Sequence, residues 1–410
     1  MKKRPRDHSE NGEPLSEGRV EYLEQARARA TRRRVRRTAI ILTILIAVVL
    51  VATGIAGTSV ALLKDGVDTL GIAAIPGTGW PQQTGIQQPL QVETLTGSFV
   101  ALGDESCVVY SNSGRRLNAI QSGYARPAIA AGKTRFVLYN RSGTELRVES
   151  RTQNLYTKTM ENGIYLCAMS DSGTLAVVTE DTTSMAKLWV YSPTMTERLN
   201  WAMSAAEGTP LRMAFSPDER RLAVAAVTAS GGQMITNLYV IPLAQGEPIN
   251  VGSQSAVPQW LGWLSQTSLL AVYDTKAVVY NVTGGEHASY EFNGQSLQSV
   301  SVDGSGNTAL LLASGQVYQV VAFNKNFDVQ CTVTVPAASS VVRAGERFYL
   351  LTETTVGCYA ASGQSSGSVQ WSEDYAVRPQ HLIVGTKRLL VFSGNTVEQL
   401  EPPQQTDSGS

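Results

Sequence analysis

A few short motifs in the sequence have the spacing of known reactive sites. Residues 363–367 place Ser365 in the G-x-S-x-G pattern of a hydrolase nucleophile elbow. That elbow needs a helix after the serine, whereas the residues that follow here, 368–371, read as a strand. The next histidine, His381, falls in a later apolar run. We therefore predict that Ser365 lies in a flexible Gly/Ser loop and is not a nucleophile.

Two further motifs suggest phosphate or metal binding. Lys133 lies in a Gly-Lys-Thr triplet like the end of a P-loop, but Pro127 stands where the first glycine is needed and a strand follows. Asp303 begins a run, residues 303–307, with oxygen-bearing side chains at alternate positions, as in calcium loops. No acidic ligand follows it. We predict that both motifs are turns between strands.

The cysteines and histidines are too scattered to form a reactive centre. The four cysteines are widely spaced and each falls in an apolar run: Cys107, Cys167, Cys331 and Cys358. We expect buried free thiols, with two disulfides as the alternative. After residue 63 the only histidines are His287 and His381, which leaves little for acid–base catalysis at neutral pH. The sequence therefore predicts no enzyme activity, no catalytic or metal site and no cofactor.

The charge of the chain is distributed unevenly. The whole sequence has 34 Lys/Arg and 34 Asp/Glu. Residues 1–37 carry twelve Lys/Arg and six Asp/Glu, a net of +6, so the rest carries 34 − 12 = 22 basic and 34 − 6 = 28 acidic groups, a net of −6. This asymmetry indicates that the two parts lie in different surroundings. The net negative charge of residues 38–410 argues against nucleic acid as a partner.

An uncharged segment separates the two parts. Residues 38–63 contain no charge, and about 20 apolar residues suffice for a helix to cross a bilayer. Five arginines precede the segment within residues 32–37, and positive charge stays inside. We therefore predict a single-pass plasma membrane protein, with a basic cytoplasmic tail at 1–37, a transmembrane helix in contact with lipid at 38–63, and an extracellular remainder.

The rest of the chain changes character at residue 91. Residues 64–90 are rich in Pro, Gly and Gln and are interpreted as a linker. Residues 91–400 alternate short Val-, Leu- and Tyr-rich runs with Gly, Ser and Asn clusters, which is typical of an all-β domain. Residues 401–410 are interpreted as a disordered C-terminal tail.

The short apolar runs recur about every 40 residues, a spacing typical of β-propeller blades. Eight units begin at Ser98, Pro127, Tyr165, Leu211, Trp260, Leu297, Ser339 and His381. We predict an all-β propeller of eight blades, or seven if the short first unit is not a separate blade. The last unit has only three strands, and Leu90–Leu95 is expected to pair with Thr396–Leu400 and complete it. The tryptophans are expected to pack between blades, with a ligand-binding face as the alternative.

The repeats also resemble known families. Residues 215–226 (FSPDERRLAVAA) resemble the repeat of TolB-like and WD40-like propellers, with Pro217 and Asp218 suited to a type I turn. Residues 356–371 resemble a quinoprotein-like repeat. The whole layout resembles an uncharacterised family of membrane-anchored extracytoplasmic propellers of Gram-positive bacteria, which implies a fold but no known activity.

Binding or scaffolding at the cell surface is the function that these features favour. A propeller presents loops and a channel to an unknown protein, peptide or cell-wall ligand. One alternative is a transmembrane sensor that couples an external ligand to a cytoplasmic partner. A quinoprotein-like enzyme is a further alternative, which would need clustered Asp, His, Arg or Glu in the channel.

Overall fold

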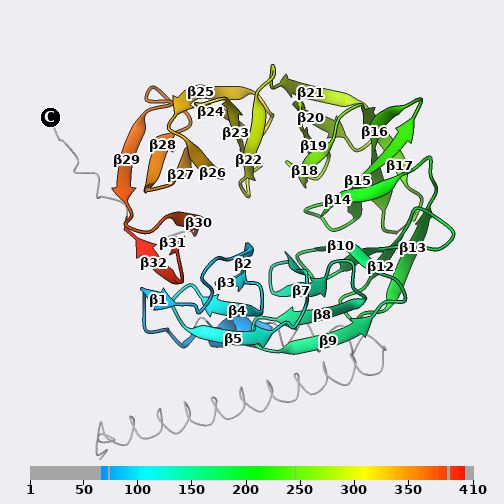
Figure 1. Cartoon of the computed structure of the whole chain (residues 1–410), viewed down its shortest axis with the longest axis horizontal. Coiled ribbons are helices and arrows are strands. Elements are labelled where there is room, and N and C mark those ends of the chain that lie inside the picture. Colours follow the sequence, from blue (N-terminus) through cyan, green and yellow to red (C-terminus); the bar gives the residue numbers. More distant parts are fainter. Residues whose placement is uncertain (1–65, 73, 245, 386–387, 402–410) are drawn as a thin grey trace, which may run out of the picture. The chain divides into compact units, whose positions relative to one another are not determined.

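The described part of the chain forms a closed ring of eight β-sheets (Figure 1). The computed structural model describes residues 66–72, 74–244, 246–385 and 388–401. The chain divides into two compact units, residues 1–63 and 64–410, and all described residues belong to the second. The predicted cytoplasmic tail and membrane span, residues 1–63, lie outside the described residues, as do residues 402–410. Among the described residues, no helix is long and apolar enough to cross a membrane.

Each blade is a four-stranded antiparallel sheet, with its first strand nearest the ring axis and its last strand at the rim (Figure 1). Blade 1 contains β2 (Gln91–Leu95), β3 (Ser98–Leu102), β4 (Ser106–Ser111) and β5 (Arg116–Gln121). Blade 2 contains β6 (Pro127–Ala131), β7 (Arg135–Asn140), β8 (Glu145–Ser150) and β9 (Asn154–Thr159). Blade 3 contains β10 (Ile164–Met169), β11 (Leu175–Thr179), β12 (Ala186–Tyr191) and β13 (Glu197–Met203). Blade 4 contains β14 (Thr209–Phe215), β15 (Arg221–Ser230), β16 (Gln233–Pro242) and β17 (Ile249–Gln254).

The remaining blades repeat this order until the last one, which takes its outermost strand from the start of the domain. Blade 5 contains β18 (Pro258–Trp263), β19 (Ser268–Tyr273), β20 (Lys276–Asn281) and β21 (Glu286–Glu291). Blade 6 contains β22 (Ser296–Val302), β23 (Thr308–Ser314), β24 (Val317–Phe323) and β25 (Val329–Val335). Blade 7 contains β26 (Ala338–Ala344), β27 (Arg347–Thr352), β28 (Thr355–Ala360) and β29 (Val369–Asp374). Blade 8 contains β30 (Pro379–Val384), β31 (Leu389–Ser393), β32 (Thr396–Leu400) and β1 (Gln82–Gln83).

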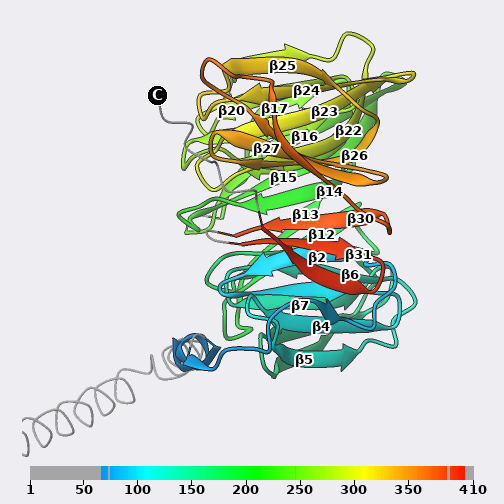
Figure 2. The ribbon, with the colours of Figure 1, turned by 90° about the vertical axis from the view of Figure 1, so that its left-hand side faces the viewer.

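Burial explains why some strands are continuously apolar and others alternate. The second strands β3 and β11 are buried at every position, because neighbouring blades cover both of their faces. At the rim, β21 alternates between exposed and partly buried residues, since solvent reaches this edge of the ring. Figure 2 shows the strands running across the thickness of the ring. The prediction of an all-β, eight-bladed propeller is therefore confirmed.

A hydrophobic cluster fills each interface between adjacent blades. The clusters between blades 3 and 4 and between blades 4 and 5, for example, hold Trp201 and Trp263 respectively. The other tryptophans of the domain also pack on such clusters: Trp80, Trp189, Trp260 and Trp371. The tryptophans therefore pack between blades, as predicted.

The predicted pairing of Leu90–Leu95 with Thr396–Leu400 is wrong. Residues 91–95 form β2, the innermost strand of blade 1, and pair with β3 across a tight turn at Thr96 and Gly97. This local hairpin closes a far shorter loop than a pairing with the other end of the domain would. β2 also supplies the strand that the short first repeat lacked. The partner of β32 is β1, which lies in the segment interpreted as a linker.

The segment before β1 is attached to blades 1 and 2. Residues 66–72 are helical, and Ile72 is buried. The Asp68 carboxylate accepts a hydrogen bond from the Thr152 hydroxyl (2.9 Å), and the Arg151 guanidinium donates to Thr69 Oγ1 (2.6 Å). These contacts involve the turn after β8, on the face of the ring where the innermost strands end.

Candidate binding pocket where the innermost strands begin

The residues with possible chemistry lie in separate turns and strands and form no common site. Ser365 is exposed in the loop between β28 and β29, and a strand follows it as predicted. His381 lies on β30, where its Nε2 is 3.3 Å from the Pro89 carbonyl oxygen. Lys133 lies in the β6–β7 turn and forms an ion pair with Asp171 (2.7 Å).

Asp303 stabilises its own turn and the neighbouring one. Its carboxylate accepts hydrogen bonds from the backbone N–H groups of Ser305 (2.8 Å) and Asn307 (3.0 Å). It also accepts one from the N–H of Gly345 in blade 7 (2.8 Å). Residues 303–307 therefore form a turn between β22 and β23, and the alternate oxygen-bearing side chains serve that turn.

The cysteines are free thiols in the structure. Cys107, Cys167 and Cys358 are buried, and Cys331 is partly exposed. Burial raises the pKa of Cys107 to about 12 and that of Cys358 to about 11, so both remain protonated at neutral pH. Among the described residues, no group of three or more His, Cys, Asp or Glu is arranged to hold a metal.

A cavity of about 700 Å³ lies where the innermost strands of blades 1 to 4 begin. It extends from Gln91 at the start of β2, across the start of β6, to β10 and β14. Its lining residues are Gln91, Arg126, Ile129, Tyr139, Arg141, Ser142, Tyr165, Leu166, Cys167, Thr209, Pro210, Leu211, Arg212 and Met213. The cavity is therefore on the face opposite to the contacts of residues 68–72, which lie where the innermost strands end.

Three arginines give this pocket a positive charge. Arg126, Arg141 and Arg212 line it, and the lining contains no carboxylate. Within the described part of the chain, none of the three guanidinium groups has an ion-pair partner. Burial, and next the like charge of Arg141, lower the pKa of Arg212. The pocket therefore holds positive charge that the protein itself does not neutralise.

Two hydrogen bonds to backbone carbonyls hold Arg212 in place. Arg212 donates from Nε to the Gln259 carbonyl of blade 5 (2.7 Å) and from Nη1 to the Leu211 carbonyl (2.8 Å). Tyr139 and Tyr165 form part of the wall, and burial raises the pKa of Tyr139 to about 12. A fixed fork of donors beside aromatic surface suits carboxylate or phosphate groups.

Sequence reasoning missed this pocket, although the repeats contain a signal for it. Arg126 precedes Pro127, the first residue of one repeat, and Arg212 follows Leu211, the first residue of another. An alignment that matches the first strand of each repeat would have placed both arginines at the same end of two innermost strands. Neither arginine belongs to a recognisable motif.

Comparisons with known proteins agree with this architecture. The model of a family described as "Family of unknown function (DUF5711)" matches residues 81–401. The chain belongs to this family. The matched range begins one residue before β1 and ends one residue after β32, so it coincides with the propeller. A search of curated proteins finds no match.

Several solved structures resemble this fold at low sequence identity. BamB from Moraxella catarrhalis is 13% identical with a TM-score of 0.52, over 80% of this chain and 100% of that one. Sqt1 from Saccharomyces cerevisiae is 10% identical with a TM-score of 0.56, over 79% and 98%. Sqt1 from Chaetomium thermophilum, bound to the N-terminus of the ribosomal protein L10, is 13% identical with a TM-score of 0.55, over 78% and 98%. At these identities the likeness shows the fold alone.

Proposed function

We propose that this DUF5711 protein is a membrane-anchored binding or scaffolding propeller, without enzyme activity, whose arginine-lined pocket takes an acidic peptide segment. The observation that carries the proposal is the group Arg126, Arg141 and Arg212 around one cavity without a carboxylate. Uncompensated arginines beside tyrosines favour a ligand that brings negative charge and some apolar surface. The solved Sqt1 complex with the N-terminus of L10 supports peptide binding as a use of this fold.

The anchor in this proposal is the uncharged segment at residues 38–63, with the propeller outside the plasma membrane. Residues 66–72 enter the propeller on the face opposite to the pocket. Residues 66–72 therefore do not cover the pocket. A cell-surface protein with an acidic segment, or an anionic cell-wall polymer, has the required charge.

A sensor is the second candidate, and one set of contacts favours it. Asp68 and Thr69, a few residues after the uncharged segment, contact the β8–β9 turn of blade 2. Ile72 lies beside Gly97 in the β2–β3 turn of blade 1, and both blades also line the pocket. A ligand in the pocket would then alter the segment next to the anchor. Loss of ligand-dependent partner recruitment in Asp68→Ala, with binding intact, would support the sensor.

A peptide-binding assay on the full chain in detergent tests the main proposal. The probe is a fluorescein-labelled heptapeptide of alternating Gly and Glu, measured by anisotropy. The double variant Arg141→Gln/Arg212→Gln should weaken binding at least tenfold, since each charge-assisted hydrogen bond contributes about 1.5–3 kcal/mol. Arg116→Gln, on the exposed start of β5, is the matched control. Equal affinity of the double variant and the control would contradict the proposal.

A further inference from the structure

The outermost strand of blade 8 is much shorter than that of any other blade. β1 has two residues, whereas the other seven outermost strands have six or seven. It pairs with Thr396 and Val397 only. Among the described residues, the stretch of β32 from Glu398 to Leu400 therefore has no strand beside it on the rim side.

Trp80, two residues before β1, explains why this strand stops. Trp80 stacks on Phe99 of blade 1, with the ring centroids 5.9 Å apart, and its Nε1 donates to the Asn112 carbonyl (3.0 Å). These contacts direct the chain away from β32 and towards blade 1.

The unpaired stretch presents backbone groups to solvent. The Thr84 N–H donates to the Asn395 carbonyl (2.8 Å), and Gln82 pairs with Val397. An antiparallel ladder alternates, so residues 395, 397 and 399 direct their backbone N–H and C=O groups outward. Residue 399 lies beyond the end of β1, and its two groups are free to pair with an added strand.

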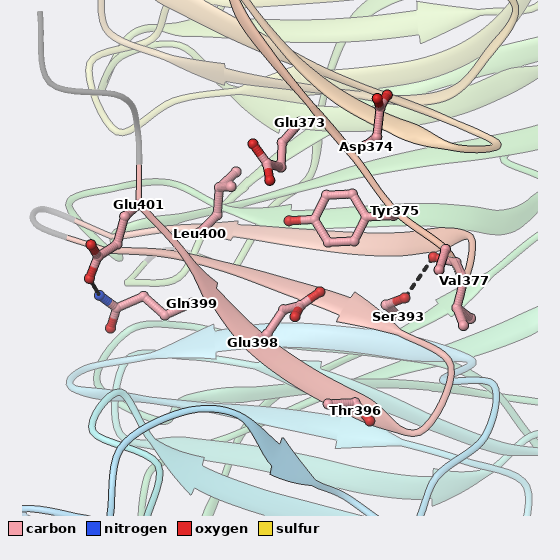
Figure 3. Close-up of a pocket in the computed structure, with 11 residues that line it drawn as sticks. Glu373, Asp374, Tyr375, Val377, Ser393, Thr396, Glu398, Gln399, Leu400 and Glu401 are labelled. Atoms are coloured by element: carbon pink, nitrogen blue, oxygen red, sulfur yellow. Dashed lines mark hydrogen bonds between the residues drawn. The ribbon is translucent and has the colours of Figure 1, made fainter.

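A cavity of about 590 Å³ lies beside this edge, between β29 and β32 (Figure 3). Four carboxylates line it, from Glu373, Asp374, Glu398 and Glu401, and no Lys, Arg or His does. Within the described residues, none of the four forms an ion pair. Figure 3 shows the Tyr375 hydroxyl between Glu373 and Glu398. Burial, followed by the charges of Glu398 and Glu373, raises the pKa of Tyr375 to about 12.

We propose that this edge binds an extended basic peptide segment of another protein, which adds to β32 as the missing part of the fourth strand. Backbone pairing would give such a strand its affinity, and side chains at alternate positions would give it specificity. Leu400 packs in the interface with blade 7, and alternation places Glu398 on the same side. The register of β1 sets Pro81 opposite Glu398, so the added strand begins beyond it. A Lys or Arg residue opposite Leu400 would meet Glu398 diagonally and Glu373 across the cavity. The site therefore selects a basic residue opposite Leu400.

The chain's own C-terminal residues do not have this chemistry. Residues 402–410 begin with two prolines, contain one aspartate and have no Lys or Arg. Proline cannot donate to a ladder, and an added carboxylate would repel the four already present. The charge of the cavity therefore favours a basic segment from another chain.

A strand-addition assay on the full chain tests the proposal. The probe is a fluorescein-labelled heptapeptide of alternating Thr and Lys, measured by anisotropy at low salt. We expect saturable binding that weakens about tenfold in Glu373→Gln/Glu398→Gln and is unchanged in Glu105→Gln, an exposed turn residue of blade 1. The same peptide with N-methyl groups on its Thr residues should bind at least tenfold more weakly to the unchanged protein. With Lys opposite Leu400, a Thr lies opposite Gln399, and its N–H is the donor that faces β32.

Each alternative occupant gives a different result. Equal binding of the N-methylated peptide, or of a Thr/Glu peptide, would overturn strand addition by a basic segment. Tighter binding after deletion of residues 402–410 would show that the chain's own C-terminus occupies the edge, and would also overturn the proposal. Arg141→Gln/Arg212→Gln should leave Thr/Lys binding unchanged, so this inference and the proposed function are tested separately.

Discussion

Glu93 lies on β2, the innermost strand of blade 1, where burial raises the pKa of its carboxyl from 4.5 to about 7. The cause is desolvation, which disfavours the charged form. Replacing it by Gln removes the titration and keeps the shape of the side chain. We expect Glu93→Gln to be more stable than the parent protein at alkaline pH and about equally stable at acidic pH.

The size and the sign of this effect follow from the pKa. A shift from 4.5 to about 7, at 1.36 kcal/mol per unit, corresponds to about 3 kcal/mol. Between these pH values the folded state binds more protons than the unfolded state, so the free energy of unfolding falls as pH rises. The cost is absent below pH 4.5 and fully present above about pH 7. Glu93→Gln should therefore gain up to about 3 kcal/mol at pH 8.

Urea denaturation of the full chain at pH 5, 6, 7 and 8 measures this gain. Other carboxylates also titrate, but they contribute equally to both proteins, so the difference between variant and parent isolates Glu93. Glu105→Gln, exposed in the β3–β4 turn of the same blade, is the matched control and should show no trend with pH. A variant-to-parent difference that stays the same from pH 5 to pH 8 would refute the reasoning.

Three other predictions concern ring closure, turns and topology. Trp80→Ala should lower the free energy of unfolding by about 2–4 kcal/mol in urea denaturation, because the stack on Phe99 is lost. Asp303→Ala should lower it by about 1–3 kcal/mol, since three backbone N–H groups lose their acceptor, while acidic-peptide affinity stays unchanged. A reporter that works only outside the cytoplasm should be active when fused after Ser410, and should lose uniform orientation when the arginines at 32–37 are neutralised. A reporter active only in the cytoplasm would contradict the proposed anchor.

The blades could be predicted from the sequence because the sheet pattern is local. Each unit joins apolar strands by turns with recognisable residues, such as Gly173 and Gly306, which have positive φ in their turns. Glu219 occupies the matching position of the Phe215–Ala226 repeat, also with positive φ. Its carboxylate accepts a hydrogen bond from the backbone N–H of Ser172 in the preceding blade (2.7 Å). Because this local unit recurs along the chain, the sequence predicts a ring of similar blades.

The closing strand could not be predicted in the same way. β1 has the sequence Gln-Gln, too short and too polar for any periodicity, and it lies in a segment rich in Pro, Gly and Gln. Its place depends on tertiary contacts made by Trp80. Leu90–Leu95 alternates well and so appeared to be the free strand, although it was needed within blade 1. The arginine pocket was missed for a related reason, because Arg141 and Arg212 meet only when blades 2 and 4 are placed around the axis.

Side-chain packing, more than backbone pairing, closes the ring, and this is why an open edge can persist in blade 8. Phe99 of blade 1 meets Phe392 of blade 8 edge to face, with ring centroids 5.2 Å apart, and both are fully buried. Ile86 and Trp80 pack on the same cluster. Each buried aromatic residue of this kind contributes several kcal/mol. β1 contributes only two residue pairs. A peptide that adds to β32 would therefore leave this cluster intact and would displace no described strand, so its backbone pairing would count directly towards affinity.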